Sequence, residues 1–530
     1  MTEPSAHNVA DLLARTASQH GGRPALVTDT TIITWAELDV AVSRVASALQ
    51  HRGVREGDRV VLVLPTSVDF VTAYLGTLRA GGVAIPLNTG YTAGELARLI
   101  GRTEASVVIT GEPSTTMVRQ AVAGIADALV DASGDLADRR VPLLVVTGAA
   151  LPDEAAYADV VAGEGVPTPH GRGGEDVAVM LFTSGSSADA RAAMLSHRAL
   201  VCNLDQLMSL DPRPVTETDV MLGVLPLFHV YGLNTVLGQA LAAGAAVVVS
   251  ERFDPAHTLT QVVRHAVTIV PVAPPMLVAW SDLDDLADAL AGVRYLVSGA
   301  APLPVWVIED ITARTGVPIH QGYGLTEAAP VVTTTFASPQ LKPGSVGRPL
   351  PGTDVMLVDE SGELVDEGDP GEVVVRGPNL FSGYWPGDIE GPDPDGWWRT
   401  GDVAYADHDG DLFLVDRIKD LVIVNGFNVY PREVEEVLLQ HPDVAQAAVV
   451  GVPDRRTGEA VKAVVVAEEG HGLTVEDVTA HCREMLARFK RPAIIEVADH
   501  LPRTPSGKIA KARLREAAAR EADKKMAGLA

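Results

Sequence analysis

The sequence predicts an α/β fold, with a large N-terminal domain of parallel sheets, a small β-rich subdomain and a small α+β C-terminal domain. The chain has 530 residues, too many for one ordinary domain. Short apolar runs alternate with segments of helical period, and a strand–helix–strand order implies a parallel sheet. Beyond residue 344, alternating strand segments are separated by Gly- and Pro-containing turns. Near residue 417 the chain restarts as a second compact unit.

The N-terminal domain should begin with an amphipathic helix over 8–19, a hairpin over 25–35 and a helix over 35–52. A strand–helix–strand unit follows at 59–64, 68–80 and 82–86. Further strands are expected at 106–110, 142–147, 177–182, 245–249 and 295–298. Ser196 is expected to cap a helix that carries Leu200, Leu204 and Leu207 on one buried face.

The N-terminal domain should end with the β-rich subdomain, which begins at 344–376, and a compact C-terminal domain should follow a charged interruption at 416–420. We place the two domains at 1–417 and 418–530, with the boundary near Lys419. Pro431, followed by glutamates, predicts the first turn of a helix. Strands are expected at 444–452 and 460–467, and a helix at 517–530.

Acidic residues outnumber basic ones: Asp and Glu total 69, Lys and Arg total 42, and the net charge is −27. Such a charge excludes a generic nucleic-acid binder. Cys202 and Cys482 form no disulfide framework. The first residues lack the pattern of a signal peptide, and the apolar run near 267–280 is too short and too broken by prolines to span a bilayer. We therefore expect a cytoplasmic enzyme.

Residues 181–197 place a Ser/Thr/Gly-rich turn after a buried strand and before a helix. Such turns hold phosphate through backbone N–H groups and hydroxyls, and no Gly-Lys-Ser/Thr follows that would make this a Walker loop. The first half of the turn resembles the phosphate loop of the adenylate-forming superfamily, which includes acyl-CoA synthetases, aryl-CoA ligases, luciferases and peptide-synthetase adenylation domains. The matching residues are Thr183, Ser184, Gly185, Ser186 and Ser187. In the second half, Ala188 and Ala192 replace glycines, Ala190 replaces a proline and Arg191 replaces a lysine.

The resemblance covers essentially the whole chain, with the motifs in the family order, and it implies an adenylate site. Residues implied to contact the adenine, the α-phosphate or the acyl pocket are Gly299, Ala300, Ala301, Gly322, Tyr323, Gly324 and Thr326. Glu327 matches the magnesium-binding glutamate, since carboxylates are ligands that Mg²⁺ prefers. Asp402 and Arg417 would contact the ribose, and Lys419 would be the hinge of a mobile C-terminal domain.

The same resemblance implies a route for coenzyme A. Gly426, followed by Phe427, would border the pantetheine tunnel, and His229 lies in the segment that gates it. Lys508 matches the lysine that reaches the carboxylate and the α-phosphate during adenylation. The implied catalytic set is therefore Thr326, Gly426, Lys508 and His229. Relatives that activate amino acids carry Phe-Asp in the His229 segment, and the lack of that Asp favours a plain carboxylic acid.

Members of this superfamily first form an acyl-adenylate from ATP and a carboxylate, and a thiol then displaces AMP. Because alanines replace loop glycines, we expect that adenylation is lost or impaired. The protein would then convert an acyl-adenylate and CoA to acyl-CoA, and a separate adenylating enzyme would supply the adenylate. The alternative is a complete ligase that uses ATP, Mg²⁺ and CoA. An AMP-binding pseudoenzyme and a luciferase-like oxygenase stay open. The small and apolar pocket candidates, among them Ala328 and Val332, favour an apolar carboxylate.

Overall fold

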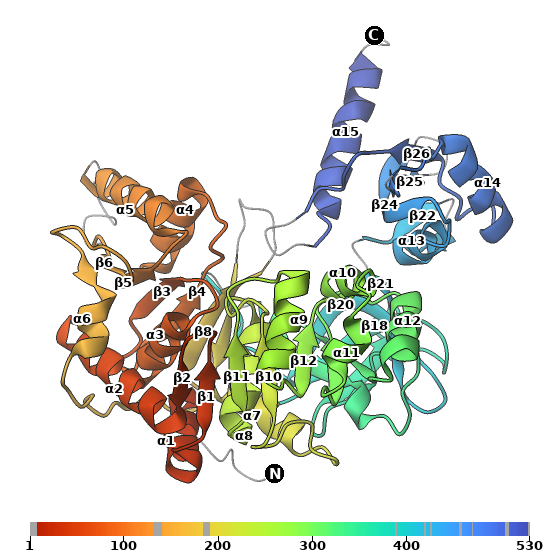
Figure 1. Ribbon diagram of the computed structural model, residues 1–530. Coiled ribbons are helices and arrows are strands. Elements are labelled where there is room, and N and C mark those ends of the chain that lie inside the picture. The colour runs from red at the N-terminus through yellow and green to blue at the C-terminus, as the bar shows by residue number, and fades with distance from the viewer. Residues whose placement is uncertain are drawn as a thin grey trace. The chain divides into compact units, whose positions relative to one another are not determined.

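The computed structural model describes residues 8–130, 140–183, 191–386, 390–417, 420–424, 427–454, 458–468, 470–503 and 508–527 (Figure 1). The chain divides into two compact units. The first comprises residues 1–354 and 375–398, and the second comprises residues 355–374 and 399–530.

One sheet of the first unit has the strand order β7-β6-β5-β3-β4-β8-β9-β19. Its strands are β3 (Arg59–Val63), β4 (Val83–Pro86), β5 (Val107–Thr110), β6 (Leu143–Val146), β7 (Ala155–Ala156), β8 (Val177–Phe182), β9 (Ala192–Ser196) and β19 (Tyr384–Trp385). The run from β7 to β8 is parallel, whereas β9 and β19 are antiparallel to their neighbours. Strands β4 and β5 are buried throughout, as expected for a sheet covered on both faces. The helices are α3 (Val68–Arg79), α4 (Ala93–Thr103), α5 (Thr115–Val130) and α6 (Tyr157–Ala162).

The other sheet of this unit has the order β2-β1-β11-β10-β12-β13-β14-β15-β16 and is parallel from β1 to β14. Its strands are β1 (Pro24–Val27), β2 (Ile32–Thr34), β10 (Val220–Gly223), β11 (Ala246–Val249), β12 (Ile269–Val272), β13 (Tyr295–Ser298), β14 (Ile319–Gly324), β15 (Val331–Thr334) and β16 (Arg348–Pro349). The remaining helices of the first unit are α1 (Val9–His20), α2 (Trp35–His51), α7 (His197–Met208), α8 (Gln239–Ala243), α9 (Pro255–Arg264), α10 (Pro274–Ser281), α11 (Leu286–Leu290) and α12 (Val305–Thr315), with a π-helix η1 (Tyr231–Gly238) and 3₁₀ turns η2 (Thr326–Ala328) and η3 (Thr335–Ala337).

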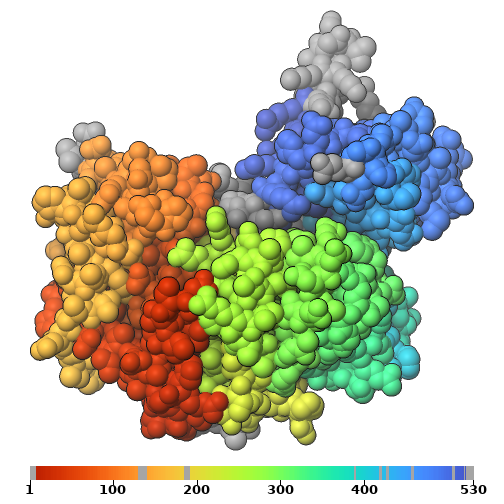
Figure 2. All heavy atoms as spheres, in the orientation of Figure 1, coloured from red at the N-terminus to blue at the C-terminus, as the bar shows by residue number. Residues whose placement is uncertain are grey.

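A single hydrophobic cluster joins the two sheets of the first unit. It takes Leu62 from β3, Val248 from β11 and the fully buried Trp35 from α2. Figure 2 shows the N-terminal residues packed against those near residue 250 on one face, in agreement with the parallel pairing of β1 and β11.

The second unit contains a sheet of order β17-β18-β20-β21, which is the expected β-rich part, and a C-terminal α+β part. The strands are β17 (Asp354–Val358), β18 (Gly371–Arg376), β20 (Trp397–Ala406), β21 (Leu412–Arg417), β22 (Val422–Val424), β23 (Phe427–Val429), β24 (Val444–Asp454), β25 (Gly458–Ala467) and β26 (Ile494–Val497). The helices are α13 (Pro431–Leu438), α14 (Val475–Met485) and α15 (Lys511–Ala527). Cys482 is buried in the core between α13, α14 and β24 and behaves as a small apolar residue.

The fold class predicted from the sequence is confirmed. The two compact units, however, group the β-rich sheet with the C-terminal part, whereas we had assigned it to the N-terminal domain. The expected boundary at 417/418 and the hinge at Lys419 stay predictions, because residues 418 and 419 lie outside the described residues.

Candidate active site

The phosphate loop connects two antiparallel strands. Phe182 at the end of β8 pairs with Ala192 at the start of β9, and the Thr183 N–H donates to the Arg191 carbonyl over 3.1 Å. The expected strand-to-helix turn is therefore wrong, because β9 intervenes before α7 begins. Ser196 does cap α7 as predicted, accepting the Ala199 N–H over 3.1 Å. Ser184, Gly185, Ser186, Ser187, Ala188 and Ala190 lie outside the described residues.

The structure around Ala192 corrects one expectation, that an alanine in place of the family glycine at this position impairs adenylation. Ala192 lies in extended backbone within β9 and is fully buried. A glycine is required only where φ is positive or a neighbour leaves no room for Cβ, and this extended strand position needs neither. The alanine at position 192 is therefore no argument for loss of adenylation.

Arg191 carries a positive charge at the C-terminal end of the loop. Its guanidinium forms an ion pair with Glu390, in which the two side chains are 50% and 60% exposed. The Arg191 Cζ also lies 5.5 Å from the centroid of the Tyr384 ring, within the range of a cation–π contact. An exposed ion pair of this kind contributes little to the stability of the fold, so the guanidinium can leave Glu390 and bind a phosphate instead.

Glu327 lies in η2, directly after β14, and a separate segment holds it. The Phe381 N–H donates to the Glu327 carbonyl over 2.8 Å, and the Tyr384 hydroxyl donates to the Glu327 Oε1. Burial, followed by the charge of Glu327, raises the pKa of Tyr384 far above its usual value. The phenol therefore stays protonated and remains a donor to the carboxylate.

The donor set at Glu327 fits a magnesium ion. Mg²⁺ in nucleotide sites is bound through one or two carboxylates together with substrate phosphates, without an all-protein cage. Glu327 supplies a half-buried carboxylate, and the neighbouring Thr326 supplies a hydroxyl. Tyr384 and Glu390, the groups that complete this cluster, were not predicted from the sequence.

The motif from Gly322 to Thr326 forms the end of β14 and the start of η2. A Cβ at Gly324 would lie 2.1 Å from the Pro330 carbonyl oxygen, so only glycine fits there. Tyr323 is 6% exposed, and most of its ring packs inside the unit. At Gly322 a Cβ would lie 2.9 Å from the Thr333 carbonyl oxygen of the paired β15.

The implied acyl pocket is bordered by Tyr231. A Cβ at Gly299 would lie 3.3 Å from the Tyr231 ring, whose hydroxyl donates to the Val297 carbonyl over 2.9 Å. Ala300 and Ala301 are exposed in the loop after β13, and Ala300 has φ of +70°. Such backbone strain in a non-glycine residue is typical of functional loops.

The other small and apolar residues expected near the acyl group lie in the interior of the first unit or pack against its core. Ala328 and Val332 are fully buried, Ala329 packs in the large core cluster and Val331 packs against Leu207 and Leu350.

His229 lies two residues before the first residue of η1. Its Nδ1 accepts the Tyr231 N–H over 3.3 Å, and its carbonyl accepts the Leu233 N–H over 2.9 Å. Single π turns are frequent at functional sites. This π-helix could not be predicted from the sequence, because its apolar residues have no distinctive period.

In the second unit, Asp402 and Arg417 are direct cross-strand partners on β20 and β21. Asp402 is 7% exposed, and its N–H donates to the Thr400 Oγ1 over 3.1 Å. The two residues implied to contact the ribose therefore start from adjacent backbone positions. Phe427 opens β23, whereas Lys419 and Gly426 lie outside the described residues.

Lys508 is exposed shortly before α15. The chain around it is held by a bridge between Arg503 and Ile509 and by the ion pair of Lys511 with Glu435 of α13, 2.8 Å long. Burial raises the pKa of Glu435, against the opposing effect of Lys511. Lys490 also pairs with a carboxylate of α13, Glu433, over 2.5 Å.

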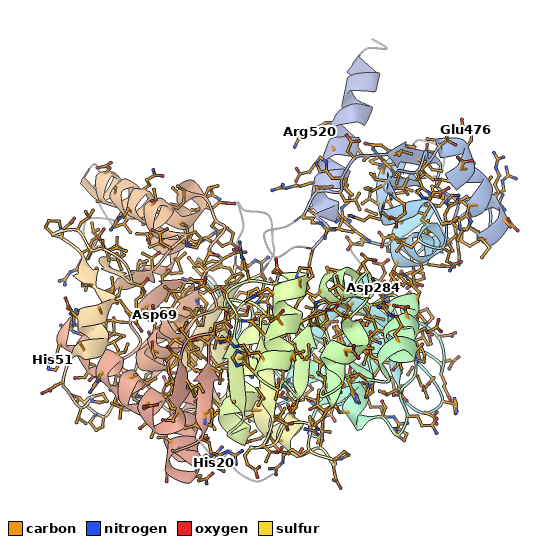
Figure 3. The ribbon with its side chains drawn as sticks, in the orientation of Figure 1. His20, His51, Asp69, Asp284, Glu476 and Arg520 are labelled. Carbon is orange, nitrogen blue, oxygen red and sulfur yellow. The ribbon has the colours of Figure 1, made fainter. Side chains whose placement is uncertain are left out.

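A cavity of about 690 Å³ lies elsewhere in the first unit, at the carboxyl ends of β1 and β11. Its lining includes Thr66, Glu251 and Asp69, which is labelled in Figure 3, and none of the expected site residues. Thr66 accepts the Leu227 N–H over 3.2 Å, which links this cavity to the segment that leads to His229. Across the part of the chain that the structure describes, no helix is both long and apolar enough to cross a membrane.

Comparison with known proteins agrees with this geometry. A family model described as AMP-binding enzyme matches residues 13–385, and one described as AMP-binding enzyme C-terminal domain matches residues 433–508. The chain therefore belongs to the AMP-binding enzyme family, within the adenylate-forming superfamily.

The relatives place the chain among the acyl-CoA ligases. It is 36% identical to 4-coumarate–CoA ligase 5 of Oryza sativa subsp. japonica, over 91% of this chain and 89% of that protein. It is 33% identical to the long-chain-fatty-acid–CoA ligase of Bacillus subtilis (strain 168), over 91% of this chain and 90% of that protein. The crystal structure of ATP-bound MatB from Rhodopseudomonas palustris is 33% identical, with a TM-score of 0.86 over 96% of this chain and 99% of that chain.

Proposed function

We propose that this protein is a complete acyl-CoA ligase, which forms an acyl-adenylate and pyrophosphate from a carboxylate and ATP, and then an acyl-CoA and AMP. This reverses our preference from the loop sequence. The observation that carries the proposal is the placement of the Arg191 guanidinium over Tyr384, whose hydroxyl is bonded to Glu327. The loop thus brings a cation beside the carboxylate implied to bind Mg²⁺. The similarity to an ATP-bound structure supports the same conclusion.

In the first step, the carboxylate oxygen of the substrate attacks the α-phosphorus of ATP, and pyrophosphate leaves. Arg191 would take over the role of the family lysine, holding the departing phosphates by charge, although a guanidinium is planar and an ammonium is not. Lys508 would stabilise the charge on the α-phosphate and the incoming carboxylate. A magnesium ion at Glu327 would offset the negative charge of the phosphates.

In the second step, the CoA sulfur attacks the acyl carbonyl and AMP leaves. Asp402 and Arg417 would hold the ribose of the adenylate, and Gly426 would leave room for the pantetheine arm. His229 lies before the π-helix that carries Tyr231, and we assign this segment to the thiol entrance.

A second candidate is a ligase reduced to its thiolation step, supplied with acyl-adenylate by another enzyme. It is favoured by Ala188 and Ala190, which stand where the family has glycine and proline. Arg191 and Lys508, both groups that serve adenylation, weigh against it. An AMP-binding pseudoenzyme and an oxygenase have no specific observation in their favour.

A split assay on the purified protein separates these candidates. One arm supplies ATP, Mg²⁺, CoA and a panel of carboxylic acids, and the other supplies the synthetic acyl-adenylates of the same acids with CoA. Thioester in both arms is expected for the complete ligase. Thioester in the second arm alone would refute the proposal and establish the reduced ligase.

The substrate we propose is an apolar carboxylic acid. Buried Ala328 and Val332 and the ring of Tyr231 offer apolar surface near the implied pocket. The relatives named above are ligases of an aryl acid and of long-chain fatty acids by their names, so aryl acids and fatty acids of graded length form the first panel. A substrate preference for short polar acids would contradict this assignment.

A further inference from the structure

One short segment, residues 381–385, holds Glu327 at two points. The Phe381 N–H donates to the Glu327 carbonyl over 2.8 Å, and the Tyr384 hydroxyl donates to one oxygen of the Glu327 carboxylate. The first contact fixes the backbone of Glu327 and the second fixes the rotation of its side chain. A carboxylate with one oxygen engaged in this way presents the other oxygen in a defined direction.

Tyr384 is itself held firmly. Its strand, β19, pairs with β9, so that Tyr384 lies opposite Ala193, and the Gly383 carbonyl accepts the Met194 N–H over 2.9 Å. The Tyr384 ring makes edge contacts with Phe381 and Trp398, at centroid distances of 5.0 and 6.2 Å. A polar group that orients a reactive side chain needs such packing to keep its own rotamer.

The same ring also contacts the phosphate loop. Ala193, the strand partner of Tyr384, follows Arg191 by two residues, and the Arg191 Cζ lies 5.5 Å from the ring centroid. One side chain therefore offers its face to the cation of the loop and its hydroxyl to the carboxylate. Tyr384 is therefore in contact with both charged side chains.

We propose that Tyr384 is a positioning residue for the ATP-dependent step: its hydroxyl orients the Glu327 carboxylate toward the metal–nucleotide complex, while its ring contacts Arg191. This inference rests on the proposed function, in which Glu327 binds the metal. The thiolation step uses no metal, so the hydroxyl of Tyr384 should matter in the first step only.

The variant Tyr384→Phe keeps the ring and its edge contacts and removes the hydroxyl. Loss of a group that orients a metal ligand typically costs 10–100-fold in metal affinity or activity. We expect about a tenfold increase in the Mg²⁺ concentration needed for half-maximal adenylation, and a rate that returns toward the wild-type value at high Mg²⁺. Thioester formation from a preformed acyl-adenylate should be unchanged, which also shows that the variant is folded.

A binding measurement tests the inference without turnover. The affinity for Mn²⁺, in the presence of a non-hydrolysable ATP analogue, is measured by electron paramagnetic resonance for the wild type, Y384F and E327Q. Tyr157→Phe is the matched control, because its buried hydroxyl also has a hydrogen-bond partner, Thr72 at 2.8 Å, but lies away from Glu327 in the fold. We expect weaker Mn²⁺ binding in Y384F and E327Q and wild-type binding in Y157F.

The outcomes separate the two proposals. Wild-type Mn²⁺ affinity in Y384F with loss in E327Q would overturn the role of Tyr384 and leave Glu327 as the metal ligand. Wild-type affinity in both variants would overturn the metal assignment in the proposed function, and the inference with it. Equal loss in Y384F and Y157F, or a loss in Y384F that high Mg²⁺ does not rescue, would show a general structural effect and refute positioning.

Discussion

Replacement of Arg191 by alanine should separate the two steps of the reaction. The guanidinium is removed from the end of the phosphate loop, whereas β9 begins only at Ala192 and keeps its pairing with β8. Because the thiolation step releases AMP and handles no pyrophosphate, the substitution should affect adenylation alone. The size of the effect depends on whether Arg191 can leave its present partners for a phosphate.

The contacts of Arg191 set the cost of that exchange. Its ion pair with Glu390 is between half-exposed side chains and is worth about 0–1 kcal/mol. The contact with the Tyr384 ring adds about 0.5–1 kcal/mol at an exposed site. A donor aimed at charge that develops in the transition state contributes about 2.7–4 kcal/mol. The exchange is therefore favourable, and R191A should lower the adenylation rate by about 10²-fold.

The assay compares pyrophosphate release with thioester formation from a preformed acyl-adenylate. R191K should retain most of the pyrophosphate release, because it keeps the positive charge and places the family's own lysine at this position. Arg264→Ala is the matched control: this arginine is also exposed and also near a carboxylate, Asp29 at 3.6 Å, but lies on α9. R264A should leave both rates unchanged.

Two results would refute this reasoning. If R191A released pyrophosphate as fast as the wild type, the cation of the loop would have no part in adenylation. If R191A lost both activities equally, the substitution would act through the fold of the β8–β9 hairpin and not through charge.

Three further predictions test the fold around the site. Burial lowers the pKa of His197 to about 3, so the unfolded chain takes up a proton at this residue below pH 6.5 and the folded chain does not. The free energy of unfolding should therefore fall by up to about 1.4 kcal/mol for each pH unit below 6.5. Chemical denaturation at pH 4.5–7 should show that His197→Asn removes this part of the pH dependence. Gly324→Ala places a Cβ 2.1 Å from the Pro330 carbonyl oxygen and should cost about 1–3 kcal/mol in thermal unfolding, whereas Gly292→Ala, with open space around it, should melt as the wild type does; equal melting of both variants would contradict the close approach. Lys511→Met leaves the Glu435 carboxylate without its cation and should cost about 3 kcal/mol, part of which E435Q in the same chain should restore; a double variant less stable than K511M would argue against the ion pair.

The strands of the parallel sheets were predictable because burial on both faces makes them continuous apolar runs. β8 and β11 were found almost to the residue for this reason. β9 was missed, because Ala192–Ser196 is a short run directly after a loop motif, and its role as a strand depends on pairing with β8 and β19. Local sequence carries no information about that pairing.

The candidate site was only partly predictable for the same reason. Glu327 could be found from its motif, but Tyr384 lies 57 residues further along the chain and reaches it through the tertiary fold. The run of aromatic residues around Tyr384 was the available signal, and it is equally typical of a packed β segment. The adjacency of Asp402 and Arg417 depends on the register of β20 and β21, which shifts between Val403 and Ala404 and so cannot be read from spacing.

The charge of the protein links these observations. In a chain with a net charge of −27, three cations each have a carboxylate partner: Arg191 with Glu390, Lys490 with Glu433 and Lys511 with Glu435. These pairs differ in burial, since the pair at the loop is half-exposed, whereas Glu435 and Lys511 are largely covered. The exposed pair, Arg191 with Glu390, costs the least free energy to break, and it is the one in contact with Tyr384, which binds Glu327. The loop therefore keeps an exchangeable cation at the site where pyrophosphate would leave, and this favours charge, more than glycine content, as the property that decides whether adenylation survives.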